Sequence, residues 1–179
     1  MRFLSDELAR ATGGAWYGGE DLPVEGLKRV IDDSRAVEPG DLFVAIRGER
    51  GDGHDFLHAA VERGAGGVCV EEDGSGRLPD VPVLKVEDTL AALCAIAGMH
   101  RRRFPRLPVI GITGSSGKTS TRAAITAVLE AMWPGRVLST LGNTNNFFGV
   151  PRNILRLTEE HRVAVLEVGT NHPGEVAAL

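Results

Sequence analysis

The sequence is poor in cysteine and in aromatic residues. It holds two cysteines among 179 residues, and aromatic side chains make up 5% of the chain. Cys69 and Cys94 each lie within an apolar stretch, at residues 68–70 and 93–96. We interpret both as buried small hydrophobic residues, because two thiols in such surroundings indicate neither a disulfide framework nor a metal site.

Long apolar runs and a strong excess of one charge are also missing. No apolar run approaches the roughly 20 residues that span a bilayer, and residues 1–7 become acidic too early for a signal peptide. The formal net charge is -4, and we interpret the basic run at residues 101–103 as a solvated helix end. We therefore expect a cytoplasmic protein that binds no nucleic acid and inserts into no membrane.

The first hundred residues alternate between short strands and helices. Strands are predicted at residues 30–31, 41–46, 68–70 and 81–84. Ser5 and Asp55 are the predicted N-caps of two helices, and a third, amphipathic helix is predicted over residues 90–97. The stretch Phe-Pro-Arg-Leu-Pro at residues 104–108 interrupts this alternation. We place a domain boundary there.

The two predicted domains comprise residues 1–104 and 105–179. In the second, strands are predicted at residues 109–112, 137–138 and 163–166, the last of them an apolar run typical of a parallel strand covered on both faces. A stripe at spacings of three and four residues is assigned to the core: Ile125, Val128, Leu129 and Met132. Strands separated by helices predict an α/β fold, with a mixed α/β N-terminal domain followed by the start of a parallel α/β domain.

The strongest chemical signal is Gly-Ile-Thr-Gly-Ser-Ser-Gly-Lys-Thr-Ser at residues 111–120. It lies between a predicted strand and a predicted helix, the context of a phosphate-binding loop. We assign the nucleotide phosphates to Gly114, Ser115, Ser116, Gly117, Lys118, Thr119 and Ser120. Lys118 supplies a charge for the β- and γ-phosphates, and the hydroxyl of Thr119 is a ligand for Mg²⁺. The alternative, a glycine-rich turn that holds Lys-Thr by chance, is disfavoured by the flanking elements.

The glycine spacing departs from the common G-x-x-x-x-G-K-[ST] pattern, because Ile112 stands where the first glycine is expected. This weakens a generic nucleotide-hydrolase interpretation. Glu167 ends the apolar run 163–166, so it faces the edge of the sheet at which ligands bind in open α/β folds. We predict that Glu167 binds Mg²⁺ and is catalytic together with Lys118. The alternative is a carboxylate that simply reaches solvent at a strand end.

Three asparagines follow the predicted strand at residues 137–138: Asn143, Asn145 and Asn146. Their amides could recognise a polar substrate, and turn formation explains them equally well. His172 lies in Asn-His-Pro, where a loop before a helix accounts for it about as well as a site does. All four are kept as candidate substrate-binding residues.

The loop at residues 113–119 resembles the ATP loop of the Mur ligases, whose glycine spacing it shares. Two later stretches strengthen the resemblance: Gly-Asn-x-Asn-Asn-x-x-Gly-Val-Pro at residues 142–151 and Glu-Val-Gly-x-Asn-His-x-Gly-Glu at residues 167–175. Residues 33–35, 39–45 and 48–56 are similar to the family's domain for the substrate nucleotide. The resemblance covers essentially the whole chain.

The resemblance implies an ATP- and Mg²⁺-dependent amide-bond ligase of peptidoglycan precursor synthesis. The motifs are similar to those of the member that joins D-Ala-D-Ala to UDP-MurNAc-tripeptide through an acyl phosphate. Ser34, Arg35 and His54 are then expected near the UDP-sugar, and a monomer is expected. Family features beyond residue 179, among them the C-terminal domain, are absent here, so this chain alone is expected to have no ligase activity.

Three alternatives remain at this point. The related ligase that adds the third amino acid typically has Thr-Thr-Pro and Glu-x-Ser-Ser at the corresponding positions, and this sequence has neither. A nucleotide-binding module without catalytic activity is compatible with the short chain. A small kinase is poorly compatible with the glycine spacing and with the match of the first domain.

Overall fold

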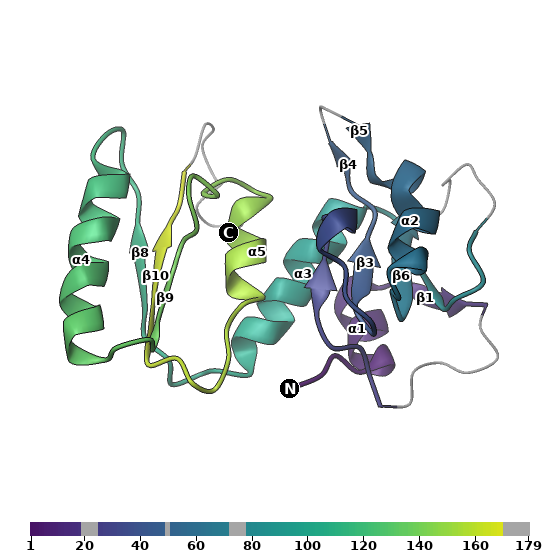
Figure 1. Cartoon of the computed structure of the whole chain (residues 1–179), viewed down its shortest axis with the longest axis horizontal. Helices are drawn as coiled ribbons and strands as arrows, with labels where there is room; N and C mark the ends of the chain where they lie inside the picture. Colours follow the sequence, from purple (N-terminus) through teal and green to yellow (C-terminus); the bar gives the residue numbers. More distant parts are fainter. Residues whose placement is uncertain (19–24, 49–50, 72–77, 170–179) are drawn as a thin grey trace. The chain divides into compact units, whose positions relative to one another are not determined.

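The computed structural model describes residues 1–18, 25–48, 51–71 and 78–169. The chain forms two compact units, Met1–Ile96 and Ala97–Leu179 (Figure 1). Helix α3 (Thr89–Arg102) contains the point of division, whereas the boundary proposed from the sequence, between residues 104 and 105, follows the end of this helix. Both units contain parallel strands and helices, so the predicted α/β class is confirmed.

The first unit contains a five-stranded sheet in the order β1-β7-β6-β3-β2. Its strands are β1 (Ala15–Tyr17), β2 (Val30–Ile31), β3 (Leu42–Val44), β6 (Gly67–Glu71) and β7 (Val83–Val86). Strands β2, β3, β6 and β7 are parallel, and β1 pairs antiparallel with β7. A small hairpin of β4 (Arg47–Gly48) and β5 (Gly51–Asp52) follows β3. The predicted strands at residues 30–31 and 68–70 are confirmed as β2 and β6, whereas β3 is shorter than residues 41–46 and β7 begins two residues later than the predicted 81–84.

Two predicted helix caps in this unit are wrong. Helix α1 (Ser5–Thr12) has Leu4 as its N-cap, so Ser5 is the first helical residue. Helix α2 (Leu57–Glu62) follows a 3₁₀ turn, η2 (Gly53–Phe56), and the carboxylate that caps this turn belongs to Asp52, which accepts a hydrogen bond from the His54 amide. The additional turn moves the start of the α-helix past Asp55. A second 3₁₀ turn, η1 (Ser34–Ala36), follows β2.

Apolar side chains of the sheet and of α2 form the core of the first unit. Its buried members are Val37, Phe43, Ala45, Leu57, Ala60, Ala65, Val68, Val70 and Val83. Cys69 is fully buried on β6, as predicted, and burial raises the pKa of its thiol to about 12. Cys94, on α3, is half-buried, and the pKa of its thiol is likewise raised by burial. Both thiols are therefore protonated at neutral pH and serve in packing.

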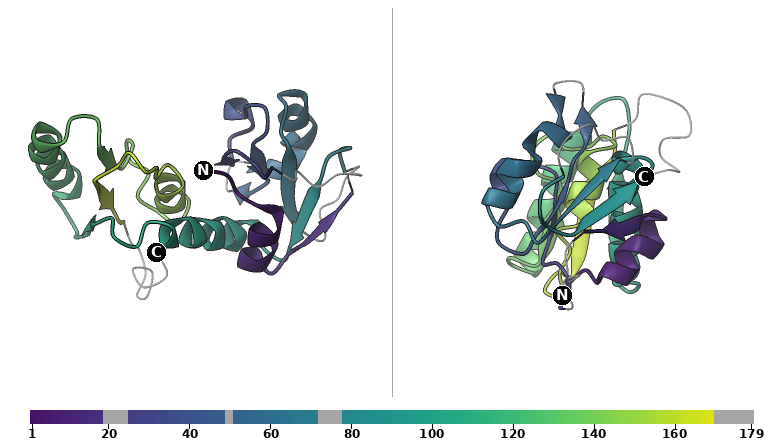
Figure 2. Two further views of the ribbon diagram at one scale, coloured as in Figure 1. Left: turned by 90° about the horizontal axis from the view of Figure 1, so that it is seen from below. Right: turned by 90° about the vertical axis from the view of Figure 1, so that its right-hand side faces the viewer.

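The second unit contains a three-stranded parallel sheet in the order β8-β10-β9 (Figure 2). Its strands are β8 (Val109–Ile112), β9 (Val137–Ser139) and β10 (Val163–Glu167). The central strand β10 is buried along its whole length, as the apolar run predicts. Helix α4 (Lys118–Met132) lies on one face of this sheet, and α5 (Gly149–Ile154) lies on the other. The α5 face carries most of the core, including Leu138, Val150, Ile154, Ala164 and Leu166.

The predicted core stripe of α4 is wrong in part. Val128 and Met132 are 63% and 60% exposed, whereas Ile125 and Leu129 are half-buried. The side of α4 that faces the sheet carries polar groups: Thr126 hydrogen-bonds with Ser139, and Arg122 donates to carbonyl groups that follow β9. Hydrogen bonds to the ends of strands, rather than apolar packing alone, thus determine which side of α4 turns inward.

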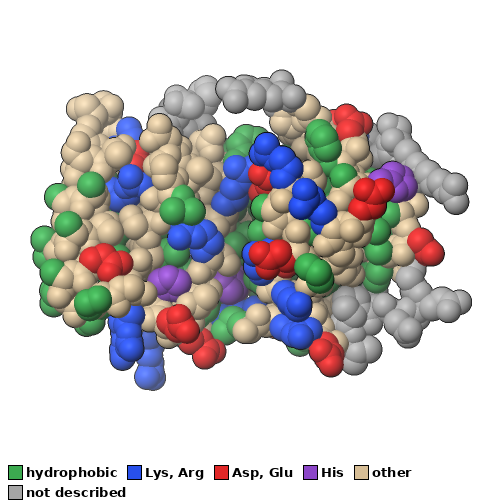
Figure 3. Space-filling model, in the orientation of Figure 1, with side chains coloured by type: hydrophobic (Ala, Val, Ile, Leu, Met, Phe, Trp, Pro, Cys, Tyr) green, Lys and Arg blue, Asp and Glu red, His purple; other side chains and the backbone are tan. Residues whose placement is uncertain are grey.

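Charged side chains of both signs lie interspersed on the face of the molecule seen in Figure 3. Within the described ranges, none of the helices combines the length and the apolar character that crossing a membrane requires.

Candidate functional site

The parallel sheet of the second unit brings the glycine loop and Glu167 to the same edge. Strand β8 pairs with β10 so that Ile112, the last residue before the loop, lies opposite Glu167. Strand β9 pairs with the other side of β10, and the asparagine-containing loop leaves its carboxyl end. Three segments far apart in sequence therefore converge at the carboxyl ends of parallel strands, the place where open α/β sheets bind ligands.

The glycine loop leads directly into α4. Gly117 is the N-cap of this helix with φ of 77°, a left-handed conformation that glycine adopts without strain. The first turn of α4 closes with the hydrogen bond from the Thr121 amide to the Gly117 carbonyl. The amides of Lys118, Thr119 and Ser120 thus precede the first hydrogen bond of the helix and add to the positive end of its dipole. An anion is favoured at this position.

The side chains of Lys118 and Thr119 point to different parts of the site. The ammonium of Lys118 donates to the carbonyl of Gly114, 2.6 Å away, and so lies over its own loop. The hydroxyl of Thr119 donates to Glu167 and is 3.2 Å from each carboxylate oxygen. The loop thereby combines a cation held over its own backbone with a hydroxyl that is hydrogen-bonded to a buried acid. Ser115, Ser116 and Ser120 of the same loop are exposed.

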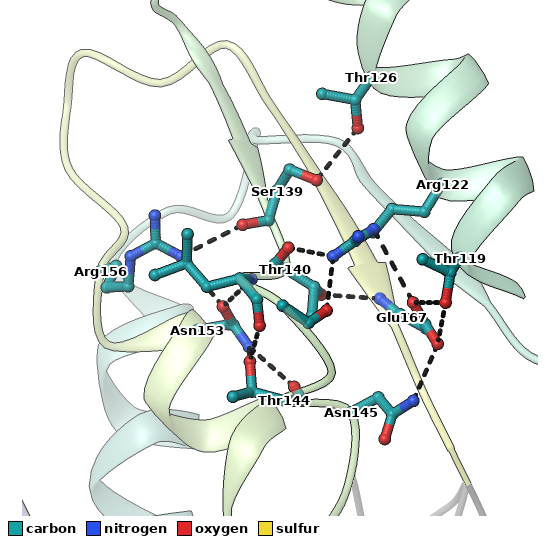
Figure 4. A network of polar contacts seen from close by, with 12 residues as sticks. Thr119, Arg122, Thr126, Ser139, Thr140, Thr144, Asn145, Asn153, Arg156 and Glu167 are labelled. Atoms are coloured by element: carbon teal, nitrogen blue, oxygen red, sulfur yellow. Dashed lines mark hydrogen bonds and ion pairs between the residues drawn. The ribbon is translucent and has the colours of Figure 1, made fainter.

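Glu167 is 2% exposed, so the alternative in which its carboxylate simply reaches solvent is wrong. Its backbone amide donates to the Thr140 hydroxyl at 2.9 Å. Its Oε1 accepts from the side-chain Nδ2 of Asn145 at 2.8 Å. The Arg122 Nε lies 3.8 Å from its Oε2. Figure 4 shows these groups surrounding the carboxylate together with Thr119. A buried charge needs such partners, because an unpaired carboxylate away from water is strongly destabilised.

The donor set fits Mg²⁺ held together with a nucleotide. Among the residues that the structure describes, no cluster of three or more histidine, cysteine or acidic side chains could hold a metal by itself. Mg²⁺ is usually held by one or two carboxylates, retained waters and substrate phosphates rather than by a cage of protein ligands. One hydroxyl, from Thr119, and one carboxylate, from Glu167, beside an anion-binding loop match this pattern.

The three predicted asparagines have different surroundings. Asn145 contacts Glu167 through its side chain, and its carbonyl accepts from the Gly169 amide at 2.6 Å. The side chain of Asn146 accepts from the amides of Phe148 and Gly149, as turn formation requires. Asn143 is exposed, and only its backbone takes part in the hydrogen bonds found among the described residues. The side-chain amide of Asn143 is therefore available to a ligand.

Asn153 on α5 holds the asparagine-containing loop in place, and the sequence pattern did not identify it. It is 2% exposed. Its Nδ2 lies within hydrogen-bonding distance of the Thr144 carbonyl and hydroxyl and of the Gly149 carbonyl, and its Oδ1 accepts from the Leu141 amide and from Arg156 (Figure 4). One side chain thus hydrogen-bonds backbone groups at both ends of the loop that places Asn145 beside Glu167.

Replacing Asn153 with alanine is expected to lower the free energy of unfolding by about 2–4 kcal/mol, because backbone groups of Thr144, Gly149 and Leu141, the Gly149 carbonyl among them buried, lose their partner. Urea unfolding followed by circular dichroism measures the loss. Asn143→Ala, an exposed position in the same loop, is the matched control and should stay within about 0.5 kcal/mol of the parent. Equal effects of the two substitutions would contradict this role for Asn153.

The predicted UDP-sugar residues of the first unit lie at the carboxyl edge of its parallel strands. Ser34 and Arg35 form η1 directly after β2, and His54 lies in η2 after β3 and the β4–β5 hairpin. Arg35 is largely exposed and ion-paired with Asp33. In contrast to Arg35, the His54 side chain is buried. Its Nε2 accepts from the Glu71 amide at 3.1 Å, and its Nδ1 is 2.6 Å from an Asp52 oxygen. Both ring nitrogens of His54 are thus used within the protein.

His172 lies outside the described residues. Two further residues at Glu167, Arg122 and Thr140, were not predicted from the sequence. The signal for Arg122 was present, because it follows Thr119 by three positions on the same helix and so shares its face. Thr140 had no such signal, since its contact with Glu167 joins the residue after β9 to the end of β10.

A glycine loop between a parallel strand and a helix, beside an acid on the adjacent strand, is the arrangement of the phosphate-loop class of α/β proteins. Residues 112–179 match the Mur ligase middle domain, and residues 29–101 match the model described as Mur ligase family, catalytic domain. The chain belongs to the Mur ligase family.

Its relatives include the UDP-N-acetylmuramoyl-tripeptide–D-alanyl-D-alanine ligase of Escherichia coli K12, 44% identical over 151 residues, which cover 84% of this chain and 32% of that enzyme. Among solved structures, MurF from Acinetobacter baumannii matches 99% of this chain and 38% of its own with a TM-score of 0.87 and 37% identity. MurF from Thermotoga maritima, solved in complex with ADP, matches 84% of this chain and 34% of its own with a TM-score of 0.69 and 33% identity. The chain spans about a third of the length of these relatives.

Proposed function

We propose that this chain provides the UDP-sugar domain and the first part of the ATP-binding domain of a cytoplasmic, monomeric ligase that joins D-Ala-D-Ala to UDP-MurNAc-tripeptide. The observation that carries the proposal is the contact between Thr119 of the phosphate loop and the buried carboxylate of Glu167. Further support comes from relatives of this specificity that match most of the chain.

In the proposed reaction, a carboxylate oxygen of the tripeptide attacks the γ-phosphorus of ATP, and the bond from this phosphorus to the oxygen of the β-phosphate breaks to release ADP. The amine of D-Ala-D-Ala then attacks the carbonyl carbon of the acyl phosphate. Phosphate leaves, the amine loses a proton, and an amide bond remains. No covalent bond to the protein forms, so the residues of the chain act by binding, orienting and neutralising charge.

The roles of the site residues follow from their chemistry. Lys118 places an ammonium on the phosphates, and the amides at the start of α4 bind their oxygens. Thr119 and Glu167 would hold Mg²⁺, which would neutralise charge on the phosphates. Asn145 orients Glu167, Asn143 and Asn146 meet the peptide substrate, and His172 is kept as a further substrate-binding residue from the sequence motif. In the first unit, Ser34 and Arg35 face the UDP-sugar, and His54 supports them by fixing η2.

The test is product formation by the protein translated from the complete gene. We expect mass spectrometry to detect UDP-MurNAc-pentapeptide when UDP-MurNAc-tripeptide, D-Ala-D-Ala, ATP and Mg²⁺ are supplied together, and not when any one is omitted. UDP-MurNAc-dipeptide with a free diamino acid tests the ligase that adds the third residue. Product from that pair alone would contradict the proposed specificity, and nucleotide binding without any amide product would indicate a non-catalytic module. The same assay on the 179-residue chain tests the expectation that it is inactive alone.

A further inference from the structure

Arg122 is the positively charged side chain closest to Glu167 among the ion pairs of the described residues. It extends from the second turn of α4, its side chain is 13% exposed, and its Nε lies 3.8 Å from Oε2 of Glu167. Nothing in the proposed chemistry uses this arginine. Its nearly complete burial beside a buried carboxylate, in a site proposed to hold a metal ion, is unexpected, because a cation and a divalent metal repel each other.

The hydrogen bonds of Arg122 explain how it is held. Its Nη1 donates to the carbonyl of Gly142 at 3.1 Å and to the carbonyl of Thr140. Thr140 in turn receives the Glu167 amide on its hydroxyl. The guanidinium is therefore fixed by the segment after β9, and it faces the carboxylate from a distance longer than a hydrogen bond (Figure 4). It contributes charge to Glu167 without a direct hydrogen bond between Nε and the carboxylate.

We propose that Arg122 is a positioning residue that serves as the built-in counter-ion of Glu167, a role that rests on the proposed function of this acid. A carboxylate that is 2% exposed needs a nearby positive charge whenever Mg²⁺ is not bound. Arg122 supplies that charge and so keeps the ligand-free site folded. When Mg²⁺ binds, the same charge opposes it, so Arg122 also limits the affinity of the site for the metal and favours its release after turnover.

The proposal predicts the direction in which stability and metal affinity change in Arg122→Gln. This substitution keeps a hydrogen-bond donor and removes the charge. Without Mg²⁺ the variant should be less stable than the parent, and added Mg²⁺ with ADP should raise its melting temperature more than that of the parent. The enhancement of ADP affinity by Mg²⁺ should also increase, by about fivefold or more, because a repelling charge near the metal has been removed. Arg122→Lys keeps the charge and should remain close to the parent.

The experiment uses the complete gene product, with ADP titrated calorimetrically in EDTA and in MgCl₂ and thermal unfolding followed in the same buffers. Arg156→Gln is the matched control, because Arg156 donates to the carbonyl of Ser139, next to the Thr140 carbonyl that Arg122 uses, and otherwise to Asn153. The Arg156→Gln variant should lose as much stability, relative to the parent, in MgCl₂ as in EDTA. If the ADP affinity of the parent protein is the same in EDTA and in MgCl₂, the result argues against the proposed function of the site as a whole.

The inference about Arg122 fails separately if the parent responds to Mg²⁺ and the Arg122→Gln variant does not respond more strongly. A variant that is equally destabilised, or unfolded, at every Mg²⁺ concentration would overturn it, because that result assigns Arg122 to packing alone. A Lys variant that behaves like the Gln variant would overturn it as well, since the charge would then be irrelevant.

Discussion

Replacing Lys118 with alanine is expected to lower the rate of ATP-dependent ligation by about 10³-fold or more. Its ammonium is the positive side chain placed over the glycine loop, and a removed charge clamp costs this much when negative charge develops on a transferring phosphoryl group. The measurement is steady-state ADP release by the complete gene product. The melting temperature should hardly change, because the hydrogen bond of the Lys118 side chain within the described part of the chain goes to the Gly114 carbonyl of its own loop, in an exposed position.

Lys85→Ala is a matched control for this substitution. Lys85 lies on β7 of the first unit, where its ammonium is 4.9 Å from the centre of the Tyr17 ring. Its loss should leave the rate of ADP release within about twofold, since it removes an exposed contact of low energy outside the site. A Lys118→Ala enzyme with unchanged turnover would remove the phosphate-binding role from the loop.

Replacing Gly149 with alanine is expected to destabilise the protein by about 3 kcal/mol or more and to disorganise the loop before it. A β-carbon at this position would lie 2.2 Å from the carbonyl carbon of Thr144 and 2.4 Å from its oxygen. These are backbone atoms that cannot rotate away, and overpacking against them forces the chain to move. The movement would also displace Asn145 from Glu167, because Asn145 directly follows Thr144.

Gly98→Ala provides a control of opposite sign. Gly98 lies within α3, where an added β-carbon meets only the end of the flexible Arg102 side chain at 3.6 Å. Alanine should stabilise this helix by about 0.5–1 kcal/mol, because glycine loses more backbone entropy on folding. Chemical unfolding of both variants gives the comparison. If Gly149→Ala unfolds with the stability of the parent, the tight approach of the two loop segments is not a requirement of the fold.

These substitutions address two separable properties of the site. Lys118 contributes charge at an exposed loop, whereas Gly149 and Asn153 determine the shape of the segment that supports Glu167. Activity should therefore fall without loss of stability in the first case and together with stability in the second. The distinction matters for assigning residues to chemistry, since a loss of turnover alone does not separate a group that contacts the nucleotide from one that supports it.

The sequence by itself determined the elements whose signals are local. The loop at residues 111–120, its position between strand and helix, and the buried strand ending at Glu167 were all predicted, because glycine spacing and apolar runs act over a few neighbouring residues. The parallel arrangement then placed Glu167 beside the loop by a general rule of α/β sheets.

The tertiary structure alone decided which polar groups meet. Arg122 lies in a helix whose sequence reads as amphipathic, and its contacts with the segment after β9 were not predicted. His54 is fixed by the Asp52 carboxylate and the Glu71 amide. Asn153 stabilises a loop whose asparagines could not be ranked from composition. Each of these side chains contacts groups from another part of the chain, whose position no periodicity encodes. The outward position of Val128 was likewise not evident from the apolar spacing along α4, which groups it with the half-buried Ile125 and Leu129.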